Sequence, residues 1–67
     1  MTFTLTLKCD NAAFGGSDAE RDGPSEECLA EVARILESAA IKIASGRDGC
    51  GLMDYNGNRV GDCHFTE

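Results

Sequence analysis

The sequence predicts a small α+β fold with the element order β-α-β-β, in which one helix packs on one face of a three-stranded antiparallel sheet. Three observations support this fold. Residues 2–9 alternate apolar and polar side chains, residues 25–45 carry an apolar stripe at helical spacing, and Asn56-Gly57 separates two further strand-like runs. With 67 residues, the chain is expected to form a single small domain, residues 1–67.

The first strand is predicted over Thr2–Cys9, where pattern and propensity agree. One face of this strand is apolar and consists of Phe3, Leu5, Leu7 and Cys9. The other face carries Lys8 and three threonines, which are good strand formers. We therefore expect one side of the sheet to be in contact with water.

A long connection, Asp10–Pro24, leads from this strand to the helix. Glycine, aspartate and serine are frequent in it, so no long regular element is expected. Phe14 is its one large apolar residue, and we expect Phe14 to anchor the loop under the end of the helix. A connection of this length in so small a domain is more often functional than neutral.

The helix is predicted over Ser25–Ser45. At about 100° per residue, its core-facing stripe consists of Leu29, Val32, Ala33, Leu36, Ala40 and Ile43, with Ala39 and Cys28 at one edge. The remaining face carries Glu27, Glu31, Arg34, Ser38, Ile41 and Lys42. Either Pro24 occupies the first helical position or Ser25 is the N-cap, and Gly46 suits the C′ position.

Gly49–Tyr55 and Asn58–Phe65 are predicted to form a hairpin around Asn56-Gly57, the strongest two-residue turn signal. The resulting register pairs Asp54 with Arg59, Leu52 with Gly61, and Cys50 with Cys63.

This register makes one hairpin face apolar through Cys50, Leu52, Cys63 and Phe65. The other face then carries Met53, Tyr55 and Val60, and a one-residue slip or bulge would exchange the two faces. The first strand can lie beside either hairpin strand. We expect it beside the last strand, because the sheet is then antiparallel throughout.

Charge is the unusual property of the composition. Twelve acids and six bases give a net charge of −6, and the whole excess lies between residues 10 and 37, where eight acids meet two bases. Such a surface repels nucleic acid and anionic membranes and attracts basic proteins. The first residues lack the basic start of a signal peptide, and no run approaches the ~18 apolar residues of a membrane span, so a cytoplasmic location is expected.

Several residues could suggest metal binding or catalysis, but their spacing favours an ordinary structural role. The four cysteines and His64 could bind zinc, but no Cys-x₂₋₄-Cys spacing occurs, which favours buried reduced thiols. A cross-strand Cys50–Cys63 disulfide is the alternative if the protein meets an oxidant. Residues 54–58 copy three ligand positions of a calcium loop, but arginine and phenylalanine replace its glycine and last glutamate. A single histidine and no phosphate loop favour a protein that is not an enzyme and has no cofactor.

Two segments, FTLTLKCDNAAF (residues 3–14) and DYNGNRVG (residues 54–61), resemble a family of short phage open reading frames that includes anti-CRISPR proteins. The resemblance implies an inhibitor of a type I CRISPR system, with type I-C as the first candidate, acting in the bacterial host cell. It also implies binding to the Cascade complex, at the basic surface of the large Cas8 subunit that recognises the PAM duplex. The resemblance further implies a DNA mimic, since acidic anti-CRISPR proteins often act in this way.

The first hypothesis is therefore a monomeric DNA mimic that binds a basic nucleic-acid-binding protein, without contacting nucleic acid or membrane itself. On charge alone, its partner-binding residues are Asp18, Glu20, Asp22, Glu26, Glu27 and Glu31. The alternative is a phage accessory or structural protein that associates through Met53, Tyr55 and Val60. A small metal-binding domain is the third possibility.

Overall fold

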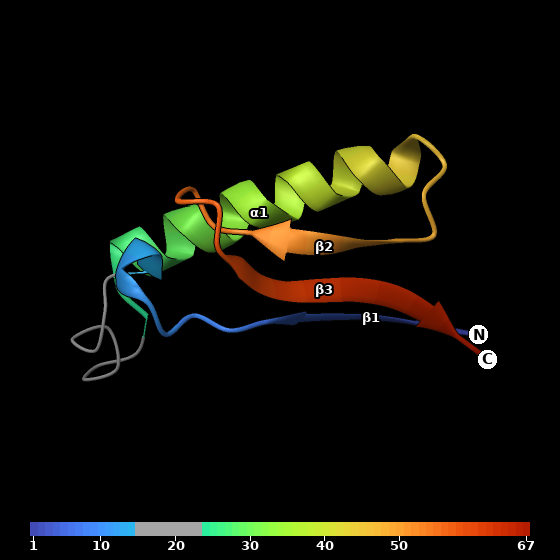
Figure 1. Cartoon of the computed structure of the whole chain (residues 1–67), viewed down its shortest axis with the longest axis horizontal. Helices are drawn as coiled ribbons and strands as arrows, with labels where there is room; N and C mark the ends of the chain where they lie inside the picture. Colours follow the sequence, from blue (N-terminus) through green and yellow to red (C-terminus); the bar gives the residue numbers. More distant parts are fainter. Residues whose placement is uncertain (15–23) are drawn as a thin grey trace.

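The computed structural model describes residues 1–14 and 24–67 (Figure 1). Along the chain lie strand β1, the short 3-10 helix η1, helix α1, and strands β2 and β3. Their bounds are, in that order, Thr2–Leu7, Ala12–Phe14, Glu26–Ala44, Gly49–Met53 and Arg59–Thr66. The strands form one antiparallel sheet in the order β1-β3-β2. The predicted α+β fold and the expected place of the first strand beside the last are confirmed.

The residues that flank helix α1 are of types that favour the two ends of a helix. Ser25 is the N-cap, in extended conformation, and its Oγ accepts a hydrogen bond of 3.1 Å from the Cys28 N–H. Gly46 has a φ of 108° and donates its N–H to the Ile43 carbonyl at 3.0 Å, so the predicted C′ glycine is confirmed. Within the described part of the chain, no helix combines the length and the apolarity needed to span a bilayer.

The predicted buried face of α1 is wrong. Leu29 and Leu36, both expected in the core, are 57% and 44% exposed. The helix buries Cys28 and Ala39, which were predicted at the edge of the stripe, together with Glu31 and Ile35. This face is rotated from the predicted stripe by about 100°, one residue step. The rotation arises because α1 packs mainly on η1 and β2 (Figure 1), so the side of the helix that carries Leu29 and Leu36 is left uncovered.

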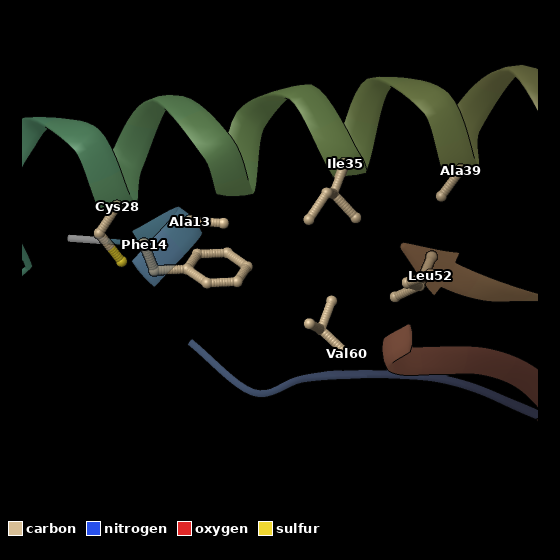
Figure 2. Close-up of a cluster of buried hydrophobic side chains, with 7 residues drawn as sticks. All are labelled: Ala13, Phe14, Cys28, Ile35, Ala39, Leu52 and Val60. Carbon is tan, nitrogen blue, oxygen red and sulfur yellow. The ribbon is translucent and has the colours of Figure 1, made fainter. Parts of the chain in front are cut away.

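The core lies between α1, η1 and the hairpin (Figure 2). Phe14 is completely buried, and its ring lies beneath the helix between Cys28 and Ile35. The expectation that Phe14 anchors the loop under the helix end is confirmed. Leu52 and Val60 complete the cluster from the sheet side.

The hairpin has a three-residue loop and a bulge, and both differ from the prediction. Cys50 pairs with Cys63 and Leu52 with Gly61 as expected, but Met53 pairs with Arg59 after a register shift. The extra residue, Val60, thereby reaches the core face, where it is 9% exposed. The predicted pairing of Asp54 with Arg59 and the predicted solvent position of Val60 are therefore wrong.

The turn itself explains the shift. The Asp54 carbonyl accepts the Gly57 N–H at 3.0 Å, and the Asp54 N–H donates to the Asn58 carbonyl at 2.9 Å. Tyr55, Asn56 and Gly57 thus form the loop, and Gly57 takes a φ of 86°. This is the geometry of a three-residue hairpin loop whose last residue is left-handed, in place of the expected two-residue turn.

Candidate partner-binding surface

The six acids predicted to bind a partner fall into three groups. Asp18, Glu20 and Asp22 lie outside the described residues. Glu26 and Glu27 are exposed in the first turn of α1, where carboxylates complement the positive end of the helix dipole. Glu31 lies one turn further along and belongs to a buried network.

Glu31 is 7% exposed, so the prediction that it lies on the solvent side of α1 is wrong. Its Oε1 accepts the Arg34 Nε–H at 2.8 Å, and its Oε2 accepts Arg34 Nη2 at 2.8 Å. Oε2 also accepts the backbone N–H of Tyr55 at 2.8 Å. These contacts explain why a carboxylate can occupy the buried face, since a buried charge has to be paired and hydrogen-bonded.

Hydrogen bonds from Arg34 hold the pKa of Glu31 below its ordinary value, although burial acts in the opposite direction. The same interaction raises the pKa of Arg34. Arg34 Nη2 also donates to the Met53 carbonyl at 3.1 Å, so this pair links α1 to the hairpin. The charge of Glu31 is consequently paired inside the molecule and contributes little to the electrostatic field outside it.

Asp54 forms a second buried network, which the sequence reasoning missed. It is 3% exposed, and its Oδ1 accepts the N–H groups of Asn56 and Asn58, both at 2.9 Å. Its Oδ2 accepts the side-chain amides of Asn11 at 2.8 Å and Asn58 at 3.2 Å. Burial acts to raise the pKa of Asp54, but these hydrogen bonds outweigh it and the pKa is lowered. Because its oxygens face N–H donors, this loop is organised as a turn rather than around a cation.

Asn11 connects this network to the loop that carries Phe14. Its Oδ1 accepts the Ala13 N–H at 2.9 Å while its Nδ2 donates to Asp54. The hairpin turn, η1 and the start of α1 are thereby held together at one end of the molecule (Figure 1). These contacts fix the position of the first turn of α1, which carries Glu26 and Glu27.

A shallow hollow of about 300 Å³ lies beside the first turns of α1 and is lined by Ala13, Glu27, Ala30, Glu31, Arg34 and Tyr55. Tyr55 is 63% exposed at its rim. Amphipathic tyrosine side chains are common in protein contacts. The candidate surface therefore places Glu27 and Tyr55 on one hollow, with the exposed Glu26 next to Glu27 in the first turn of α1.

The cysteines lie in pairs rather than around a metal. Cys50 Sγ and Cys63 Sγ are 3.2 Å apart across the hairpin, and burial together with the neighbouring Cys28 raises the pKa of Cys9. All four are free thiols. Over residues 1–14 and 24–67, no three His, Cys, Asp or Glu side chains converge as metal ligands.

Comparison with known proteins adds no relative. No protein-family model matches the chain. Neither the curated proteins nor the solved structures include a similar one.

Proposed function

We propose that this chain is a DNA-mimicking inhibitor of a type I CRISPR system, which occupies the basic surface of the Cas8 subunit of Cascade where the PAM duplex binds. The observation that carries the proposal is the charge distribution: residues 10–37 hold the entire net charge of −6. Within that segment, Glu26 and Glu27 are exposed, and Glu27 lines a hollow that Tyr55 also lines. We choose Cascade among the possible basic partners because residues 3–14 and 54–61 resemble phage proteins.

The exposed acids suit a partner that binds phosphates. Duplex DNA carries one negative charge per about 1.7 Å of its axis, so a DNA-binding groove presents several lysines or arginines within a short distance. Carboxylates at the end of a rigid helix can pair with such cations, and the association should be fast and sensitive to salt. Glu31 has no part in this surface, because its charge is paired with Arg34.

Charge reversal tests the proposal. Glu26→Lys/Glu27→Lys should weaken the binding of Cascade by about tenfold or more, since two attractive contacts become repulsive. The matched control is Asp48→Lys/Glu67→Lys, which changes the net charge equally at exposed positions away from this end of α1. Circular dichroism checks that both variants stay folded. Equal binding by both variants would refute a role for the first turn of α1.

The second candidate function is a phage accessory or structural protein that associates through the hairpin. The exposure of Met53 at 47% and of Tyr55 at 63% favours it, whereas Val60 is buried and cannot take part. Under this function, Tyr55→Ala would abolish association with the partner, and Glu26→Lys/Glu27→Lys would leave it unchanged. The Glu26→Lys/Glu27→Lys variant therefore separates the two candidates, because only the first candidate predicts that it weakens association.

A further inference from the structure

Helix α1 carries a second apolar face that the fold does not bury. Five residues form it, spaced alternately by four and three positions, and we call them the seam: Leu29, Ala33, Leu36, Ala40 and Ile43. Four of them are exposed and Ile43 is half-buried. Alternating steps of three and four are the repeat of a helix that packs along another helix. The seam spans about 21 Å at 1.5 Å per residue.

An apolar groove of about 510 Å³ continues the seam onto the sheet. It is lined by Phe3, Leu5, Leu36, Ala39, Ala40, Ile43, Ala44 and Phe65. The rings of Phe3 and Phe65 lie 4.9 Å apart on paired strands and are 44% and 42% exposed. A continuous apolar surface of this kind marks a contact site, whereas isolated exposed apolar residues do not.

We propose that a second copy of this chain covers the seam, with the two α1 helices antiparallel about a two-fold axis. The alternation of large and small residues makes the seam complementary to itself in this direction. One register places Leu36 opposite Ala33 of the second copy and Leu29 opposite Ala40. The start of the second helix then lies over the groove at Phe3 and Phe65, with Glu26 opposite Ile43.

The charge pattern selects the antiparallel direction. Glu26 lies one heptad before Ala33, so a parallel pair would place two Glu26 carboxylates side by side together with both acidic ends. Residues 38–47 carry Lys42 and Arg47 and no acid. An antiparallel pair therefore brings the acidic start of each helix toward the basic end of its partner, and the two helix dipoles oppose each other. It also leaves one acidic end at each extremity of the dimer.

Sedimentation equilibrium of the full chain tests the proposal. Under reducing conditions, the wild-type chain should sediment at twice its 7.1 kDa mass. Leu36→Arg should raise the dissociation constant by about 100-fold or more, because each dimer loses two buried leucines. Ile41→Arg is the matched control: Ile41 is 71% exposed on the same helix but lies outside the seam, so this variant should remain a dimer.

Ala40→Arg provides a second test of the same seam, and circular dichroism identifies any variant that does not fold. A monomeric wild-type chain at concentrations up to about 500 μM would overturn the proposal. So would dimers that persist in both folded seam variants, or that are lost equally in Ile41→Arg. None of these measurements involves Cascade, so failure of the dimer can be told apart from failure of the proposed function.

Discussion

Replacing Glu31 with glutamine should destabilise the protein without weakening its binding to a partner. The carboxylate accepts three hydrogen bonds of 2.8 Å, two from Arg34 and one from the Tyr55 N–H. Glutamine keeps the shape of the side chain but replaces one carboxylate oxygen with an NH₂ group. This NH₂ group then faces an N–H donor of Arg34 or Tyr55. The Arg34 side chain is 46% exposed, so water screens its share of the ion pair.

The expected loss is therefore dominated by one unsatisfied buried donor, about 2 kcal/mol of the free energy of unfolding. For a domain of this size, such a loss corresponds to a decrease in Tm of roughly 10 °C. Urea unfolding followed by circular dichroism measures it. Glu37→Gln is the matched control, because it removes the same charge from an exposed site of α1 and should change stability by less than about 0.5 kcal/mol.

The effect of Glu31→Gln should also depend on pH. The pKa of Glu31 is lowered in the folded state, so the carboxylate contributes stability above its unfolded pKa of about 4.3, and that contribution is lost as the pH falls through the folded value. The difference between wild type and variant should thus be complete at neutral pH and shrink in acid. Equal stability of the two proteins at pH 7, or a pH-independent difference, would show that the Glu31 carboxylate does not stabilise the fold.

Three further predictions test the fold. Gly61→Ala should prevent stable folding at 37 °C, because a Cβ would collide with the Thr6 carbonyl oxygen on β1, and proteolysis would report it; a protease-resistant variant would contradict the β1–β3 register. Ser25→Ala should lower the free energy of unfolding by about 1 kcal/mol, measured in urea, whereas an unchanged value would contradict the N-cap. Oxidised glutathione should join Cys50 to Cys63 in an intramolecular disulfide, found by peptide mapping. Its formation should accelerate at alkaline pH, because the hydrogen bond between the thiols and burial raise the pKa of Cys63, and failure to form it at high pH would contradict the pairing.

The elements and the sheet order could be predicted because the sequence carries local signals for each strand and for the helix. Strict alternation defines β1, and a serine N-cap and a C′ glycine delimit α1. The buried face of α1 could not be predicted from periodicity, because the helix has two apolar faces. Leu29 and Leu36 make the more apolar one, but Ile35 occupies the core, and the buried Glu31 disguises that face in the sequence.

The candidate site could be predicted only in part, for a similar reason. Exposure of Glu26 and Glu27 follows from their place in the first helical turn. The burial of Glu31 depends on the Tyr55 N–H, a contact 24 residues away that no local pattern encodes. The role of Asp54 had a local signal, since Asp-x-Asn favours a turn in which the aspartate accepts the N–H two residues later.

In the proposed function, the acidic end of α1 takes the place of DNA on a basic partner. This role is tested most directly by competition between this chain and a labelled PAM-containing duplex for purified type I Cascade. We expect the chain to displace the duplex completely, and the concentration required to rise in proportion to the duplex concentration. A duplex that stays bound at saturating concentrations of the chain would contradict this role.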